Sequence, residues 1–175
     1  RLLQASLAMR GRQPELSKLI LTDRVELVET QTRNPSDKPT IIRGERIELV
    51  DASSSHASAT ITGSPSWPAH FESQGLGLSG ANINVNRGSN RLWSDGSGTM
   101  DLPAMDRDFE GRPVRNPAPV RIAWQRGMSF DGRTMRYEGS VAATGPTQRL
   151  LTDVLEVSFQ QVIRFDQIEE STQAD

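Results

Sequence analysis

Residues 151–157 read LTDVLEV, and residues 21–27, near the other end of the chain, read LTDRVEL. In both stretches apolar side chains alternate with polar ones around an aspartate. Alternation with a period of two is typical of a β-strand that buries one face. An aspartate or glycine at the break lets the backbone bend or bulge. Both stretches therefore predict a strand that kinks and then resumes with the same face inward.

The same pattern returns three times with one more residue at the break. These stretches are 42–49 (IRGERIEL), 78–85 (LSGANINV) and 130–137 (FDGRTMRY). Chance similarity among amphipathic strands is the simpler explanation, but five instances in one chain favour a true repeat. Stacked bent strands of this kind form a rolled pair of sheets with an apolar inside.

Short alternating runs bounded by Gly, Pro, Asn, Asp and Ser fill most of the chain, which predicts an all-β fold of the sandwich or jelly-roll type. Residues 87–90 predict a hairpin loop, and 30–39 and 103–119 predict long exposed loops. We expect one domain at 18–165, an N-terminal segment at 1–17 that fits either a helix or a strand, and a flexible acidic tail at 166–175. The runs lie at 18–27, 40–50, 57–61, 69–72, 76–85, 91–102, 120–124, 128–137, 141–143 and 150–159.

Composition narrows the function classes. The 175 residues carry a formal net charge of −2 and no cysteine, so disulfides and thiolate sites are excluded. No basic run indicates a nucleic-acid partner. No apolar stretch approaches the roughly 18 residues that a membrane-spanning helix needs. The sequence begins without methionine, and we expect a secretion signal to have been removed from it.

Sequence features that suggest catalysis or cofactors have simpler explanations. Residues 75–80 (GLGLSG) match G-x-G-x-x-G, but an alternating strand follows where a dinucleotide site needs a helix. The two histidines, His56 and His70, lack metal-ligand spacing. Asp101, Asp106 and Asp108 fit a solvated loop better than a calcium loop. We therefore expect no enzyme activity, no metal and no cofactor.

Residues 128–159 (MSFDGRTMRYEGSVAATGPTQRLLTDVLEVSF) carry the most specific signal. Tyr137, Gly139 and Val141 precede a loop and then a strand of the form leucine-x-threonine-aspartate-x-leucine-x-valine at 150–157. Residues 76–95 look like an earlier copy of this unit. In this arrangement the chain resembles the OstA-like family of lipopolysaccharide transport, over about two-thirds of its length.

The resemblance implies a periplasmic β-jelly roll, or β-taco, with no catalytic role. It also implies that acyl chains of lipopolysaccharide or another envelope lipid are bound in an apolar groove, and that neighbouring OstA-like domains join the chain through edge strands. Arginines at the rim, namely Arg87, Arg91, Arg126 and Arg149, are expected to meet lipid phosphates. The residues expected to line the groove are Ile47, Leu49, Leu76, Leu78, Ile83, Val85, Ile122, Trp124, Met128, Phe130, Met135, Tyr137, Leu151, Leu155 and Val157.

Other interpretations of the same residues remain open at this point. The apolar set also fits a closed, dry core, which would make the chain a ligand-free structural or interaction domain of a larger envelope protein. A carbohydrate-active enzyme or a lectin on a β-sandwich is a third possibility. Trp67, Trp93 and Trp124 suit sugar stacking, a lipid groove or core packing. Trp124 is in phase with Ile122 and is expected inside, whereas Trp67 is expected at a rim.

Overall fold

In the computed structural model, residues 2–10, 13–30, 39–52, 54–73, 75–103, 112–113, 115 and 118–164 are described, and every regular element in them is a β-strand. The all-β prediction is confirmed. No helix in these ranges is long and apolar enough to span a membrane. The strands are β1 (Leu2–Arg10), β2 (Gln13–Val28), β3 (Ile41–Val50), β4 (Ser58–Thr62), β5 (Ala69–Ser73), β6 (Leu76–Gly80), β7 (Asn82–Asn86), β8 (Arg91–Asp95), β9 (Gly98–Leu102), β10 (Val120–Trp124), β11 (Gly127–Phe130), β12 (Thr134–Thr144) and β13 (Arg149–Ser158).

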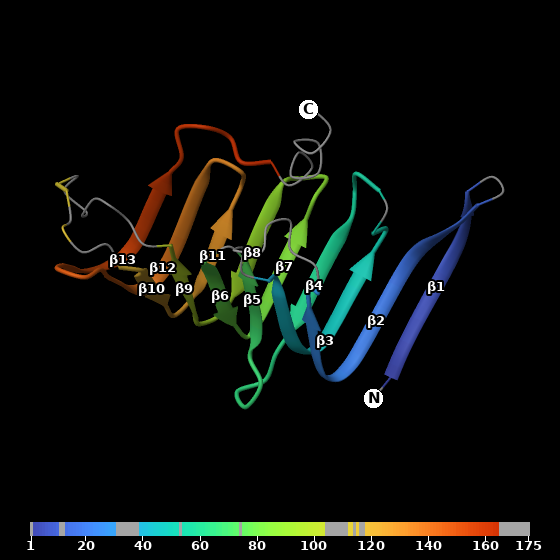
Figure 1. The fold of residues 1–175 in the computed structure, drawn as a ribbon. Coiled ribbons are helices and arrows are strands. Elements are labelled where there is room, and N and C mark those ends of the chain that lie inside the picture. Colours follow the sequence, from blue (N-terminus) through green and yellow to red (C-terminus); the bar gives the residue numbers. More distant parts are fainter. Residues whose placement is uncertain are drawn as a thin grey trace.

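All strand pairs are antiparallel and belong to one continuous sheet that closes on itself (Figure 1). One side of the closed part is formed by β4, β7, β8 and β11, and the other side by β5, β6, β9 and β10. Strands β3 and β12 join the two sides at opposite ends of the ring. The sheet therefore encloses an interior between two facing sides.

Both joining strands bend, and each half pairs on a different side. In β3, Arg46–Val50 pairs with β4, whereas Ile41–Arg43 pairs with β5. Gly44 lies at this bend, where an added Cβ would come within 2.7 Å of Ile61 Cγ2. Strand β12 bends at Gly139 and Ser140, which both have positive φ angles of 83° and 47°. The repeat predicts a kink at Gly44, which is present, whereas the bend at Gly139 and Ser140 lies outside the repeat stretches and was not predicted.

Four short connections carry the chain from one side to the other. They join β4 to β5, β6 to β7, β8 to β9 and β10 to β11. Because each connection crosses between the sides, the runs expected at 76–85 and 91–102 are each two strands. The break that the repeat predicts in 78–85 is present after Gly80, but it is a crossing between the sides and not a bend within one strand. Alternation continues through these crossings because the same face stays inward on both sides.

Three further predictions concern turns and strand boundaries, and the structure can be compared with each. Residues 87–90 connect the paired strands β7 and β8, as predicted. Residues 130–137 contain a hairpin turn at 131–133, not a bend, so this copy of the repeat is structurally different. Residues 2–10 and 13–28 are strands, and β2 continues without interruption past the boundary expected at residue 18. Residues 31–38, 104–111 and 165–175 lie outside the described ranges. They include a large part of both predicted loops and the whole predicted tail.

The interior of the ring is filled with side chains. Trp124 and Tyr137 pack with ring centroids 5.4 Å apart and are 1% and 0% exposed. The Tyr137 hydroxyl donates to the Sδ atoms of Met100 and Met135 at 2.9 and 3.0 Å. Trp124 Nε1 donates to the carbonyl of Gly96 at 3.0 Å. Burial of these side chains supplies the main stabilising free energy of the fold.

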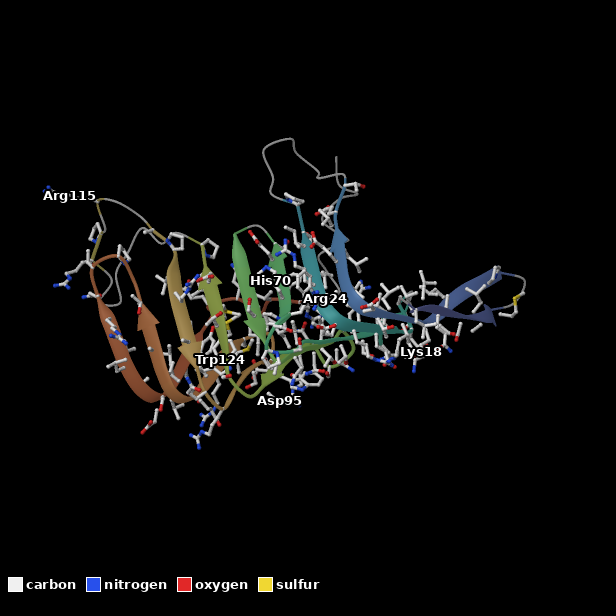
Figure 2. The ribbon with its side chains drawn as sticks, turned by 90° about the horizontal axis from the view of Figure 1, so that it is seen from below. Lys18, Arg24, His70, Asp95, Arg115 and Trp124 are labelled. Carbon is white, nitrogen blue, oxygen red and sulfur yellow. The ribbon has the colours of Figure 1, made fainter. Side chains whose placement is uncertain are left out.

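Strands extend beyond the ring at both ends. On one side β1 and β2 form a long hairpin that reaches away from the body, with Lys18 near its base and Arg24 at the bend of β2 (Figure 2). On the other side β13 pairs along the whole of β12. These strands lie outside the packed centre. Access for a ligand or a partner therefore depends on how each end of the ring is covered.

Candidate functional site

The residues expected to line a groove fall into three groups by burial. One group is half-buried and consists of Leu49, Leu76, Val85, Leu155 and Val157. Leu151 is 65% exposed on β13. The fully buried group packs together in the core and consists of Ile47, Leu78, Ile83, Ile122, Trp124, Met128, Phe130, Met135 and Tyr137. Between β3 and β12 these side chains fill the space that an acyl chain would need.

An open cleft with a mainly apolar lining lies at the N-terminal end, in the angle of the bent strand β2. Its volume is about 460 Å³. Leu3 pairs with Leu21, and Leu21 pairs with the buried Ile47, so these residues share the inward face. Val25 and Leu27, which belong to the half of β2 beyond the bend, also line the cleft. The apolar interior therefore continues past β3, where no second strand pair covers it among the described residues.

The two central residues of this bend are not glycines. Asp23 and Arg24 have φ angles of 76° and 54°, a left-handed conformation that L-residues rarely adopt. They form a bulge between Thr22 and Val25 that redirects β2 from one side of the sheet to the other. Four polar residues also line the cleft beside the apolar ones, namely Thr22, Asp23, Arg24 and Glu26.

The C-terminal end of the interior is covered. Phe159, which follows β13, packs edge-on against Phe130 with ring centroids 5.8 Å apart. The backbone N–H of Ile163 donates to the Gly132 carbonyl at 2.7 Å, and Asn90 Nδ2 donates to the Ile163 carbonyl at 2.8 Å. These contacts hold the segment after β13 against the β11–β12 turn. The N-terminal end is therefore the more accessible one.

The end strands β1 and β13 each pair on one edge only, within the described part of the chain. Both expose large apolar side chains. Leu7 and Met9 on β1 are 67% and 68% exposed, and Leu151 and Val154 on β13 are 65% and 37% exposed. An exposed apolar edge strand is a template for pairing with another chain.

The arginines expected at one rim do not form one group. Arg91 and Arg126 line the same outward cleft, next to Arg136. Arg87 lies in the β7–β8 turn, where its backbone N–H donates to the Ala57 carbonyl at 2.8 Å. Arg149 begins β13, paired with Thr144. Arg136 was not predicted, because on a strand its position is typical of a solvent-exposed residue.

The two histidines have different surroundings. His70 Nδ1 lies 2.8 Å from Ser79 Oγ, and His70 Nε2 lies 3.7 Å from a Glu72 carboxylate oxygen. His56 is exposed in the β3–β4 connection. In the described ranges no three acidic or histidine side chains gather as metal ligands would. Asp106 and Asp108 lie outside the described residues.

The tryptophans occupy three different environments. Trp124 is buried, as its phase with Ile122 predicts. Trp67 is half-buried in the β4–β5 connection, where its backbone N–H donates to the Ser64 carbonyl at 3.1 Å. Trp93 is half-buried and lines the outward cleft that also contains Arg91 and Arg126.

Sequence reasoning missed the lining of the N-terminal cleft. Leu21, Val25 and Leu27 were recognised as an alternating strand but not as cleft residues, since the bend that exposes them depends on where the sheet closes. Leu3 belongs to a segment for which helix and strand were both open.

The chain matches no protein-family model, and a search of curated proteins finds no match to it.

Proposed function

We propose that this domain is a non-enzymatic scaffold module of the cell envelope, in the periplasm, similar in role to the bridge proteins of lipopolysaccharide transport. In this proposal it has the OstA-like jelly-roll fold, joins neighbouring domains through its end strands and shields acyl chains at its open end. The observation that carries the proposal is the uncovered apolar face of the β1–β2 hairpin, which continues the interior past the closed ring.

The geometry favours acyl binding at the N-terminal cleft over the centre of the ring. Each methylene that leaves water contributes about 0.8 kcal/mol. The cleft offers Leu3, Leu21, Val25 and Leu27 for this contact, with the Arg24 guanidinium beside them for a lipid phosphate. At the centre, an acyl chain would have to displace side chains such as Trp124 and Tyr137, which are already packed.

Strand addition supports the scaffold part of the proposal. A neighbour that pairs with the free edge of β1 would continue the sheet and cover the exposed side chains of Leu7 and Met9. Pairing would also extend the apolar face of the hairpin into the next domain. The two parts of the proposal therefore depend on the same end of the molecule.

Native mass spectrometry of the protein with purified lipopolysaccharide or phosphatidylglycerol tests the lipid part. Leu27→Asp places a charge in the cleft and is expected to abolish the lipid adduct. Leu150→Asp is the matched control, since Leu27 and Leu150 are 37% and 39% exposed but only Leu27 lines the cleft. Absence of any adduct, or equal loss in both variants, would contradict acyl binding there.

A ligand-free interaction domain is the second candidate, and the filled core favours it. In that case the end strands pair with another envelope protein and the cleft is covered by that partner. The two candidates separate in light scattering. Both modules are expected to form larger oligomers as concentration rises, but growth that increases further when lipid is added supports the lipid-shielding module, and growth that lipid leaves unchanged supports the ligand-free one.

A further inference from the structure

A trench runs along β11 on the outward face of the sheet. The inward residues of β11, Met128 and Phe130, are buried, so Gly127 and Ser129 form its outward face. Both outward residues are short, and the strands on either side carry longer side chains. The result is a cleft of about 410 Å³ with β11 as its floor.

The register fixes which side chains face each other across this floor. Ser129 pairs with Trp93 on β8 and with Arg136 on β12. Gly127 pairs with Asp95 on β8 and with Glu138 on β12. One wall therefore presents an aromatic ring and a carboxylate, and the opposite wall presents a guanidinium and a carboxylate.

Trp93 does not serve the core. Strand alternation turns its neighbour Ser94 inward, where Ser94 is 1% exposed and donates to the Asn82 carbonyl at 2.6 Å. Trp93 points outward on a face whose cross-strand neighbours are Asn84 and Ser129. Arg91 Cζ lies 5.9 Å from the Trp93 ring centroid. A large indole ring on a polar sheet face is a surface suited to stacking.

Arg126 stands at the end of the trench, and its position is fixed by packing. The Gly139 Cα lies under its stem, since an added Cβ there would come within 2.8 Å of Arg126 Cγ. Its backbone N–H donates to the Glu138 carbonyl at 2.9 Å. Within the described ranges no carboxylate forms an ion pair with the Arg126 guanidinium.

The opposite wall is held by ion pairs. Arg136 Nε lies 2.6 Å from Glu138 Oε1, and Arg136 Nη1 contacts Glu156 Oε1. The hydrogen bond from Arg136 lowers the pKa of Glu138, with a smaller effect from Arg126. Glu138 therefore stays ionised as a fixed acceptor. Donors and acceptors are arranged in the trench before any ligand arrives.

We propose that this trench binds an acidic saccharide. A pyranose ring stacks on Trp93, its carboxylate or phosphate substituent meets Arg126, and its hydroxyl groups bond Ser129, Asp95 and Glu138. The balance of charge favours a sugar over a simple anion. Three arginines (Arg91, Arg126, Arg136) face three carboxylates (Asp95, Glu138, Glu156), so a bare anion gains no net attraction. This site is separate from the apolar cleft and goes beyond the proposed function.

Isothermal titration calorimetry with the intact protein tests the proposal. The probes are tetragalacturonic acid, its methyl ester, which keeps the rings without the charge, and inorganic phosphate, which keeps charge without a ring. Tetragalacturonic acid is expected to bind about tenfold or more tightly than either control probe. Trp93→Ala and Arg126→Ala are each expected to weaken its binding about tenfold, the loss of a central contact.

Two further variants make the result specific. Ser129→Tyr fills the trench floor but keeps every proposed charged contact, and it is expected to block binding without lowering the melting temperature. Arg121→Ala is the matched arginine control, because Arg121 pairs with Asp101 at 2.6 Å on the other side of the ring. Phosphate or the ester binding as tightly as the acid would overturn the proposal. So would unchanged binding by a folded Ser129→Tyr variant, or an equal loss in Arg121→Ala.

Discussion

At the scale of single residues, the buried hydroxyl of Tyr137 has weak hydrogen-bond partners. Its partners are two thioether sulfurs, from Met100 and Met135, and sulfur is a weak acceptor. Tyr137→Phe is therefore expected to change the free energy of unfolding by less than about 1 kcal/mol. Tyr137→Ala, which leaves a cavity, is expected to lower it by about 3–5 kcal/mol. Urea unfolding followed by circular dichroism measures both.

The same residue predicts how stability depends on alkaline pH. Burial raises the pKa of Tyr137, so the folded protein keeps the proton at a pH where the unfolded chain loses it. The stabilisation is complete below the unfolded pKa of about 10 and falls by about 1.4 kcal/mol per pH unit above it. Tyr137 is the only tyrosine. Tyr137→Phe is thus expected to remove this fall, and an unchanged pH profile in that variant would contradict the assignment.

At the scale of elements, alternation predicted where strands lie but not where they break. Crossings and hairpin turns carry similar residues, so 78–85 and 130–137 look alike in sequence. Hydrogen bonding separates them. Asp131 Oδ1 accepts from the backbone N–H groups of Arg133 and Thr134 at 2.9 and 2.8 Å, which closes a tight turn. At 78–85 the carbonyl of Ala81 instead accepts from Gly63, so the chain crosses between sides there.

Substitutions at the bends of β2 and β12 are expected to change the stability of the fold in opposite directions. Arg24 adopts a positive φ of 54° without being glycine, so Arg24→Gly is expected to stabilise the fold by about 0.5–1 kcal/mol. Gly139→Ala is expected to destabilise it by about 1–3 kcal/mol, because Gly139 combines a φ of 83° with the close Arg126 stem. Glu26→Gly, in the regular part of β2, is the control and is expected to destabilise. Thermal unfolding of the three variants decides.

At the scale of the whole molecule, the sequence predicted which residues form the apolar faces. It did not predict whether a ligand can reach those faces. Every residue expected in the groove except Leu151 is buried or half-buried, in keeping with the alternation. Whether such a face lines a groove or a core depends on the distance between the two sides of the sheet, which no local pattern encodes. The open cleft arises only because the ring closes at β3 and leaves β1 and β2 beyond it.

The two free edges of the molecule are different strands, and this decides the form of its assemblies. Pairing of β1 from one copy with β13 of the next is a heterologous contact, which continues into filaments unless its rotation closes a ring. Wild-type mass in light scattering is therefore expected to rise with concentration beyond a dimer. Leu7→Lys with Met9→Lys places charges on the β1 edge and is expected to weaken association about tenfold or more, with no loss of stability at two exposed positions. Val162→Lys, 54% exposed outside any strand, is the control and should associate like wild type. If the double variant associates as strongly as the control, β1 is not the joining edge.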